Sequence, residues 1–495
     1  MANLFKSRII SYRQCPKRLW LEIHKPEERD DSASEMSFKI GNKVGDVARI
    51  VFDPENTGVI IDIKELGHSQ AIAESAQLLA DGTKPIFEAG LNIPGLMAYA
   101  DVMLPNRNHG VLQWDMIEVK SSTSVKDYYR DDVAVQAYIA EQMGLSLSSV
   151  GLAYINNDYI HQEDLKYQGL FTLAELTEET KARSSEVAEW VAGAYAVADL
   201  VDEPEIEMGN QCYDPFTCSF CAYCSKGIPQ AKHPVSWFPR LSGKRKAALD
   251  AAGISEMSEV DDDFLNLIQQ RVRDVTVSGE TYFDSKGAAE DLAPYGYPAY
   301  FLDFETAMFA VPIWNGTRPF QQLPFQFSVH TLQEDGSLIH YNFLDLSGND
   351  PSQSCAKALV DQCGVKGPIF AYNAGFEKGV MCKLAERFPE YAQALENIIG
   401  RVVDLLPIAR NRYYHPSQQG SWSLKAVLPA AIPELSYAQL VGVQNGSMAV
   451  DAYMEAITPG TTTERKQELY HQLNEYCKLD TFAMVKLWEF FLSKH

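Results

Sequence analysis

The sequence predicts a protein of the α/β class with more than one domain. Segments with strand character and segments with helical periodicity alternate from about residue 296 onward, and a shorter series of strands followed by a helix lies before residue 150. At 495 residues and 46% hydrophobic composition, the chain has enough apolar side chains for several cores. No apolar run reaches the roughly 18 residues that a membrane span needs, and no signal peptide is recognisable, so we expect a cytoplasmic protein.

The N-terminal part begins its regular structure with three strands. A turn with the sequence NRNHG separates the second strand from the third, and apolar positions at helical spacing follow. The expected elements are strands at 85–93, 96–104 and 111–120, a helix at about 127–143, and a long amphipathic helical stretch at 172–200.

A change in composition near residues 225–240, marked by three prolines, indicates a connector. A helix follows that Gly253 closes, and then another helical piece. Beyond it we expect strands at 299–307, 325–332, 338–346 and 367–373, and helices at 351–363, 376–388 and about 464–494. The predicted division is therefore 1–230, a helical connector at 231–295, and 296–495.

The net charge of −23 argues against broad, non-specific coating of nucleic acid by a basic surface. It is compatible with carboxylates clustered around divalent metals. Any contact with nucleic acid must be local. Two basic clusters are candidates for it, with ordinary solvated surface charge as the alternative: Arg13, Lys17 and Arg18, and Arg240, Lys244, Arg245 and Lys246.

Two carboxylates interrupt the apolar strand YFLDFETAMF at 300–309. Residues two apart in a strand face the same way, so Asp303 and Glu305 project together. Neighbouring carboxylates repel each other unless a cation neutralises them, and Mg²⁺ or Mn²⁺ prefers oxygen ligands. The alternative is a surface strand with two solvated acids, which the aromatic flanks disfavour.

Two further segments fit the same chemistry. FAYNAGFEKG places Asn373 at a strand end and Glu377 in the first turn of a helix, and EYCKLDTFAM places Tyr476 and Asp480 one helical turn apart. The three segments, in this order, resemble the motifs of the DEDD exonucleases of the ribonuclease-H-like fold, in the version that carries tyrosine in the third motif. The second motif of that family ends in aspartate, where this chain has Glu377.

The resemblance implies a 3′ exonuclease with a two-metal mechanism. Tyr476 would orient the attacking water and Asn373 would contact the substrate. The implied ligands of two Mg²⁺ or Mn²⁺ ions are Asp303, Glu305, Glu377 and Asp480.

A second constellation lies in the N-terminal part. WDMIEVKSSTS carries Glu118 and Lys120 on one face of a strand, and Asp101 lies among apolar neighbours on the preceding strand. An acid and a lysine on one face are also consistent with a simple ion pair. The pattern resembles the PD-(D/E)XK nucleases, which have a restriction-endonuclease-like fold. It implies that Asp101 and Glu118 bind Mg²⁺ or Mn²⁺ and that Lys120 polarises the attacking water or a phosphate oxygen, with Glu88 as a candidate further ligand.

The following helix carries Gln136 and Tyr138. RecB-like members of this nuclease group have a glutamine and a tyrosine four residues apart there, and this chain has Ala140 at the second position. Gln136 is the implied substrate contact. The stretch at 41–49 offers no histidine for the upstream ligand of those members.

Four of the nine cysteines fall within 212–224, which favours a metal site over a disulfide framework in a cytosolic chain. In the iron–sulfur RecB-like nucleases, which this part resembles, one cysteine near the N-terminus joins three beyond the nuclease core. The resemblance implies a 4Fe–4S cluster held by Cys15, Cys212, Cys218 and Cys224, with Cys221 competing for one place. Four thiolates suit Zn²⁺ equally well, so zinc is the alternative.

Nearly the whole chain resembles a bacterial family of unknown function that fuses a RecB-like nuclease and its cysteine cluster to a DEDD exonuclease domain. The expected function is a two-site nuclease acting on single-stranded or processed ends, with DNA favoured over RNA. The alternatives are one live site beside a nucleic-acid-binding module, and a non-catalytic scaffold. No phosphate-loop motif is present, so a helicase or another repair or defence protein stays open as a partner.

Overall fold

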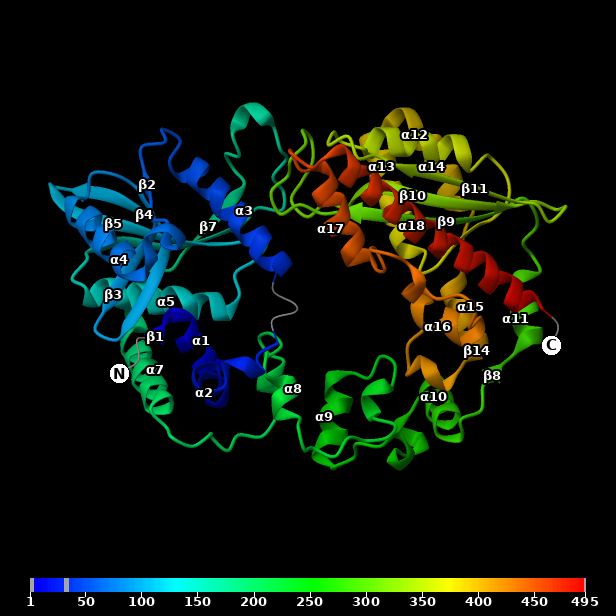
Figure 1. Ribbon diagram of the computed structural model, residues 1–495, viewed down its shortest axis with the longest axis horizontal. Helices are drawn as coiled ribbons and strands as arrows, with labels where there is room; N and C mark the ends of the chain where they lie inside the picture. Colours follow the sequence, from blue (N-terminus) through cyan, green and yellow to red (C-terminus); the bar gives the residue numbers. More distant parts are fainter. Residues whose placement is uncertain (1–3, 31–34, 494–495) are drawn as a thin grey trace. The chain divides into compact units, whose positions relative to one another are not determined.

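The computed structural model describes residues 4–30 and 35–493, and it divides into two compact units. Unit 1 contains the chain up to Ile228 together with the segment Phe309–Gln321. Unit 2 contains Pro229–Met308 and the chain from Gln322 onward. Both units combine helices with a mixed sheet, so the α/β class is confirmed (Figure 1).

The described part of unit 1 contains a seven-stranded sheet in the order β2-β3-β4-β5-β6-β7, with β1 paired to β4. Neighbouring strands from β3 to β5 are antiparallel, whereas β5 and β6 are parallel and are connected through helix α5. The strands are β1 (Leu4–Phe5), β2 (Val59–Ile60), β3 (Ile86–Ile93), β4 (Leu96–Asn108), β5 (Val111–Lys120), β6 (Leu147–Ile155) and β7 (Phe171–Glu175).

The helices of unit 1 are α1 (Lys6–Gln14), α2 (Pro16–His24), α3 (Glu35–Phe52), α4 (Ile63–Asp81), α5 (Asp127–Gln142), α6 (Thr177–Ala182), α7 (Ser184–Ala198) and α8 (Cys221–Cys224). The predicted strands before residue 121 and the helix after them are confirmed. The single helical stretch predicted at 172–200 is wrong, because its first residues form β7 and two helices share the rest. Phe171–Glu175 pairs with the edge of β6, and this pairing outweighs the helical periodicity of the segment.

The segment Phe309–Gln321 belongs to unit 1 although it connects two strands of unit 2. Ala310 and Val311 are buried in a small apolar cluster with Val44 and Tyr159. Backbone hydrogen bonds in both directions also join His161 to residues 316 and 317, each 2.9 Å long. The segment is therefore an integral part of the unit 1 core.

Unit 2 begins with short helices: α9 (Gly243–Ala251), α10 (Leu267–Ser278) and α11 (Ser285–Leu292). Gly253 adopts the left-handed conformation just after α9, as the predicted helix stop requires. The helical piece expected after it is a single 3₁₀ turn, Met257–Glu259. Val272 and Ala288 from these helices share a core with Trp488 near the C-terminus.

The five-stranded sheet of unit 2 has the order β11-β10-β9-β12-β13. Its strands are β9 (Ala299–Ala307), β10 (Leu323–Leu332), β11 (Leu338–Leu344), β12 (Ile369–Ala371) and β13 (Val402–Asp404), and a separate pair is formed by β8 (Tyr282–Phe283) and β14 (Tyr413–Tyr414). The central strand β9 is antiparallel to β10 and parallel to β12. The four strands predicted for this part are confirmed.

Helices cover both faces of this sheet. Helices α12 (Ser352–Gln362), α13 (Gly375–Arg387) and α14 (Pro389–Gly400) lie on one face, and α18 (Thr463–Leu492) crosses the other (Figure 1). The remaining helices are α15 (Leu405–Arg412), α16 (Leu424–Ala431) and α17 (Gly446–Ile457). Among the described helices, none is both long and apolar enough to cross a bilayer.

Candidate metal-binding sites

The acids of β9 lie on the face of the sheet that α18 covers. Tyr300, Leu302 and Phe304 pack against the helices of the other face, whereas Phe301 packs against α18. Asp303 and Glu305 continue the alternation of Phe301, so they face α18. The apolar C-terminal half of α18 packs in the core, and the turns before it bring Asp480 and Tyr476 to the same face as the β9 acids.

Asp480 of α18 completes a group of three carboxylates. One oxygen atom from each of Asp303, Glu305 and Asp480 lies within 4.8 Å of the others. Tyr476, one helical turn before Asp480, is buried in the same pocket, which has a volume of about 500 Å³. The structure therefore brings together the residues that the first and third sequence motifs predict.

The three carboxyl groups are electrostatically unfavourable as a set. Burial, and then the charge of Asp480, raises the pKa of Glu305 to about 8. Burial raises the pKa of Asp480 to about 6. Burial, followed by Asp480 and Glu305, raises the pKa of Asp303 well above its usual range. A cation bound between these groups would offset both the cost of burying their charges and their mutual repulsion.

Glu377 of α13 and Asn373, which lies between β12 and α13, line the same pocket. Glu377 is 3% exposed and its Oε2 atom has no hydrogen-bond partner in the structure. Burial, followed by the charge of Asp404, raises the pKa of Glu377 to about 7. Glu377 is not one of the three carboxylates within 4.8 Å of one another, but its charge also raises the pKa of Asp303.

Lys425, which lines the pocket, and Tyr437, which contacts Asp480, are not identified by the sequence motifs. Lys425 of α16 donates a hydrogen bond to the Tyr476 hydroxyl at 3.1 Å, and its Nζ lies 4.9 Å and 5.0 Å from the ring centroids of Tyr476 and Tyr437. The Tyr437 hydroxyl donates to Asp480 Oδ1 at 2.5 Å. Lys425 therefore supplies a positive charge beside the carboxylates, and Tyr437 fixes one of them.

Asp404 is a further acid near the site, and its place directly after two apolar strand residues is a signal that the sequence contains. It follows the apolar pair Val402–Val403 at the end of β13, next to β12 in the sheet. Its Oδ1 accepts hydrogen bonds from the backbone amides of Asn373 and Leu406, each at 2.9 Å. Asp404 thereby holds Asn373 in its left-handed conformation, with φ of 68°.

In unit 1, Glu118 and Lys120 lie on the face of β5 that helix α5 covers. Lys120 Nζ donates to Glu118 Oε1 at 2.6 Å, and Gln136 of α5 donates to Glu118 Oε2 at 2.6 Å. The amide of Val119 donates to Asp101 Oδ2 at 2.6 Å, which attaches the acid of β4 to β5. The structure therefore gathers Asp101, Glu118, Lys120 and Gln136, as the second constellation predicts.

Two residues missing from the predicted constellation complete this group. Lys6 of α1 lies 3.1 Å from Glu118 and 3.1 Å from Asp132 of α5, and Lys120 lies 2.5 Å from Asp132. Burial alone would raise the pKa of Glu118, but the ammonium groups of Lys120 and Lys6 outweigh it and hold that pKa well below its usual range. No local pattern predicts these partners, because Lys6 is 112 residues away from Glu118 in the chain.

Asp101 and Glu88 have the opposite electrostatic situation. Burial, followed by the charges of Glu118 and Glu88, raises the pKa of Asp101 well above its usual range. Burial, followed by Glu118, also raises the pKa of Glu88. Glu88 has a φ of 57° within β3, a strained conformation for a residue other than glycine.

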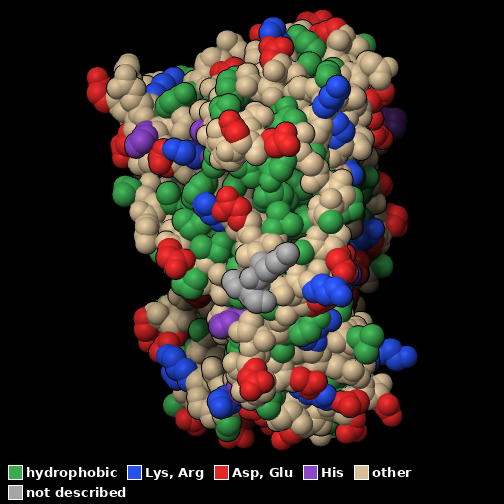
Figure 2. Space-filling model, turned by 90° about the vertical axis from the view of Figure 1, so that its right-hand side faces the viewer, with side chains coloured by type: hydrophobic (Ala, Val, Ile, Leu, Met, Phe, Trp, Pro, Cys, Tyr) green, Lys and Arg blue, Asp and Glu red, His purple; other side chains and the backbone are tan. Residues whose placement is uncertain are grey.

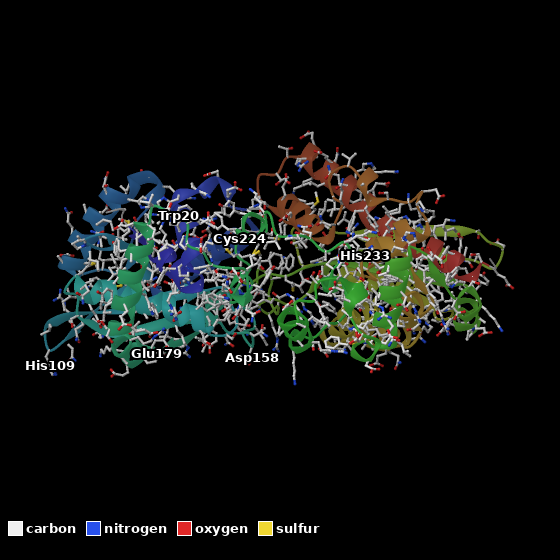
Figure 3. All side chains as sticks on the ribbon, turned by 90° about the horizontal axis from the view of Figure 1, so that it is seen from below. Trp20, His109, Asp158, Glu179, Cys224 and His233 are labelled. Atoms are coloured by element: carbon white, nitrogen blue, oxygen red, sulfur yellow. The ribbon has the colours of Figure 1, made fainter. Side chains whose placement is uncertain are left out.

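The cysteines form a third centre in unit 1. Cys15 lies between α1 and α2, and the loop from Cys212 to Cys224 packs on α2 through Trp20 and Leu21 (Figure 3 labels Trp20 and Cys224). The Gln14 amide donates to the carbonyl oxygens of Gln211 and Phe216 at 2.9 Å and 2.7 Å. The N-terminus is thereby attached to a loop about two hundred residues further along the chain.

The thiols influence one another electrostatically. Burial is the main cause that raises the pKa of Cys224 to about 11. The charge of Lys17 opposes this shift, and Cys218, Cys212 and Cys15 add to it. Burial also raises the pKa of Cys218, and Cys15 and Cys212 add to it. Cys221 instead directs its thiol to the carbonyl oxygen of Cys212 at 3.5 Å. All five are free thiols, and burial, followed by Cys218 and Cys212, raises the pKa of Cys221 as well.

The spacing of these thiols differs from that of the carboxylates in unit 2. Across the described residues, no three thiol sulfurs lie within 4.8 Å of one another. Sulfurs bound to one zinc ion at about 2.3 Å would lie about 3.8 Å apart. The thiols are thus gathered more loosely than a single ion would hold them.

The fold and sites define a two-unit α/β protein with two buried carboxylate sites and a cysteine centre. A family model with the description "Domain of unknown function (DUF2779)" matches residues 300–423. The match includes Asp303, Glu305, Glu377 and Asp404 and ends before Lys425 and α18. No curated protein matches the chain.

Proposed function

We propose that the chain is a metal-dependent nuclease with two sites, of which unit 2 is a 3′ exonuclease, and that DNA is the favoured substrate. The observation that carries this proposal is the carboxylate group of Asp303, Glu305 and Asp480, with oxygen atoms within 4.8 Å of one another. The raised pKa values of these buried acids show what such an arrangement costs without a cation. Their chemistry and spacing fit Mg²⁺ or Mn²⁺.

When bound there, divalent cations supply a hydroxide nucleophile near neutral pH and stabilise charge on the leaving oxygen. Asp303, Glu305 and Asp480 would hold them, with Glu377 beside them. Burial, followed by Asp480, raises the pKa of Tyr476 above its usual range, so its hydroxyl stays protonated and can orient water by hydrogen bonding. The Glu377 carboxyl, with a pKa of about 7 and an unpaired oxygen, is suited to accept the proton that is released.

For unit 1 we propose a PD-(D/E)XK-type site. Asp101, with Glu88 beside it, offers the uncompensated negative charge that would attract Mg²⁺ or Mn²⁺, and Glu118 would share the ion. Lys120, whose pKa is raised well above its usual range by Glu118 and Asp132 despite burial, stays charged and would polarise a phosphate oxygen or water.

A second candidate function follows from the way Glu118 is bonded. Both of its oxygens are occupied, Oε1 by Lys6 and Lys120 and Oε2 by Gln136. Lys6 and Lys120, which Glu118 shares with Asp132, already offset the charge of its carboxylate. Such a carboxylate gains little from a further cation. This observation favours unit 1 as a nucleic-acid-binding module beside a single catalytic site in unit 2.

We also propose that Cys15, Cys212, Cys218 and Cys224 hold a 4Fe–4S cluster, with Cys221 as the spare thiol. The support is that Cys15, Cys212 and Cys218 all raise the pKa of Cys224, while no three thiol sulfurs of the described residues lie within 4.8 Å of one another, as one zinc ion would require. Cys221, whose pKa Cys218 and Cys212 also raise, competes for one of the four places. Such a cluster would stabilise unit 1 by tying the N-terminus to a distant loop.

Any contact with nucleic acid has to rely on local groups. Acidic and basic side chains are interspersed over the face of the molecule in Figure 2. With a net charge of −23, the proposal predicts metal-dependent and salt-sensitive binding rather than general affinity for polyanions.

The test uses anaerobically purified protein with end-labelled single-stranded DNA and RNA, in Mn²⁺ and in EDTA. We expect cleavage only with metal. Asp303→Asn should remove release of 3′ mononucleotides, and Asp101→Asn should remove the remaining products. Two exposed aspartates provide matched control variants. Asp451→Asn is the control for unit 2, and Asp158→Asn, at a residue labelled in Figure 3, is the control for unit 1.

The outcomes separate the candidates. If Asp303→Asn alone abolishes all cleavage, unit 1 is the binding module. Absence of metal-dependent cleavage by the wild-type protein would overturn the nuclease proposal.

A further inference from the structure

A second pocket adjoins the carboxylate pocket in unit 2. It has a volume of about 680 Å³, and its lining includes Arg240, Leu267, Arg410 and Trp422. Arg410 and Trp422 also line the carboxylate pocket, so the two pockets share a wall. We call this second pocket the arginine pocket.

The arginine pocket has the opposite charge to its neighbour. No carboxylate lines it, whereas four acids line the other. Within the described part of the chain, no carboxylate lies within 4.0 Å of the guanidinium group of Arg240 or Arg410. Among the other described arginines of unit 2, Arg412 is ion-paired with Asp284 and Asp291. Arg271 and Arg401 instead donate to backbone carbonyl oxygens, so their guanidinium groups are also engaged within the protein. Two unpaired guanidinium groups in one pocket indicate an anionic ligand.

The backbone that carries Arg410 is held in place. Arg271 donates hydrogen bonds to the carbonyl oxygens of Arg410 and Asn411 at 3.3 Å and 2.8 Å, and its guanidinium lies 4.0 Å from the ring centroid of Tyr282. The Arg410 side chain is thus presented from a fixed helix end and is available for a ligand.

Apolar surface accompanies the two arginines. Trp422 is 5% exposed and its indole nitrogen donates to the Tyr413 carbonyl at 2.8 Å, so it forms a fixed apolar wall that the two pockets share. Leu267, the first residue of α10, is 80% exposed at the pocket. The side-chain oxygen of its neighbour Asn266 caps α10 by accepting hydrogen bonds from the amides of Ile268 and Gln269.

We propose that the arginine pocket binds the nucleotides of a single strand that precede the nucleotide held over the carboxylates. Arg410 and Arg240 contact consecutive phosphates, and Trp422 and Leu267 contact bases or sugars. The pairing of a carboxylate pocket with a cationic pocket suits a polyanion, because the scissile phosphate reaches the acids through metal while the next phosphates need protein cations. This inference rests on the nuclease proposal for unit 2.

The test measures binding of fluorescent oligothymidylate and oligouridylate to the full chain by anisotropy. Ca²⁺ replaces Mg²⁺, and each oligonucleotide is checked for cleavage on a gel afterwards. For single strands, each lost phosphate contact lowers the slope of log affinity against log salt by about 0.7. We expect that decrease, and an affinity loss of about tenfold, in Arg240→Ala, and about twice the slope change in Arg240→Ala/Arg410→Ala. Lys286→Ala, at an 87% exposed lysine of the same unit, should change neither.

A second measurement locates the strand independently of binding at unit 1. Oligonucleotides with 5-iodouracil two or three positions before the 3′ end are cross-linked by light and mapped by mass spectrometry. We expect cross-links at Trp422 and on the peptide that contains Leu267. Unchanged salt slopes in both variants, or cross-links confined to unit 1, would overturn the inference.

The results distinguish this inference from the proposed function. Strand binding with these properties but without cleavage in Mn²⁺ would refute the nuclease activity and leave the binding site intact. Cleavage with unchanged binding by the arginine variants would refute the binding site alone. Equal affinity for a dinucleotide and a decamer would show that the pocket takes a small phosphorylated ligand instead.

Discussion

The carboxylate group of unit 2 should destabilise the metal-free protein as pH rises, and Glu305→Gln should reduce that effect. The pKa of Glu305 is about 8 in the folded state, against an ordinary value of 4.5. The folded protein therefore binds more protons than the unfolded chain between these values, and the free energy of unfolding falls as pH rises through them.

The magnitude follows from these two pKa values. Linkage for a single group gives a loss of about 3.5 kcal/mol between pH 5 and pH 8. For a unit of this size, that corresponds to a decrease of roughly 10 °C in the midpoint of its thermal transition. Glu305→Gln removes this share, so the variant should be more stable than wild type at pH 8 and similar to it at pH 5.

The assay is calorimetry in EDTA at pH 5, 6, 7 and 8, repeated with saturating Mn²⁺. Metal should raise the transition of wild type most at pH 8 and that of Glu305→Gln much less. Glu280→Gln, at an exposed glutamate of the same unit, is the matched control. If wild type and Glu305→Gln have the same pH dependence in EDTA, the carboxylates are not in electrostatic conflict and the reasoning for a metal site fails.

Three further changes test other parts of the structure. Lys425→Met removes a positive charge that lowers the pKa of Glu305 and Asp480. In EDTA at pH 8, the free energy of unfolding of unit 2 should therefore fall by about 1 kcal/mol. Calorimetry measures this change, and an unchanged midpoint would contradict it. Lys6→Met leaves Glu118 and Asp132 with one ammonium group instead of two, so the free energy of unfolding of unit 1, measured in urea, should fall by about 3 kcal/mol. A change as small as that of an exposed lysine variant would refute the role of Lys6. Cys224→Ser should abolish the visible absorption and iron content of anaerobically purified protein while Cys221→Ser retains both; equal loss in the two variants would show that the wrong thiol is assigned as spare.

The parts of the sites that lie within one element were predictable from the sequence. Asp303 and Glu305 share a face because strands have a period of two, and Tyr476 and Asp480 share one because they are a helical turn apart. The aromatic neighbours of the β9 acids identify a buried strand. Each of these inferences needs only local geometry.

The partners that reach the sites from other elements were not predictable in this way. Lys6 reaches Glu118 only because β1 pairs with β4 and starts α1 at the edge of the group. Lys425 and Tyr437 lie outside the three motifs that the sequence offers for this site. They reach Tyr476 and Asp480 of α18 only through tertiary packing. A single sequence does not encode such pairings in its periodicity.

The error at 172–200 has a similar cause. The residues of β7 carry a helical pattern that continues into α6 and α7, but their pairing with β6 is decided by the free edge of the sheet. The strained backbone of Glu88 is equally invisible in the sequence, because glutamate carries no signal for a left-handed conformation.

The insertion of Phe309–Gln321 makes unit 1 discontinuous in the chain. A fragment that stops at Ile228 would lack Ala310 and Val311, and a fragment that starts at Pro229 would expose them to water. Neither half can be excised by one cut; separate production requires a short linker from Met308 to Gln322 and a grafted copy of the inserted segment. A single break in the chain, whether made by a protease or by a gene fusion, therefore cannot release either unit intact.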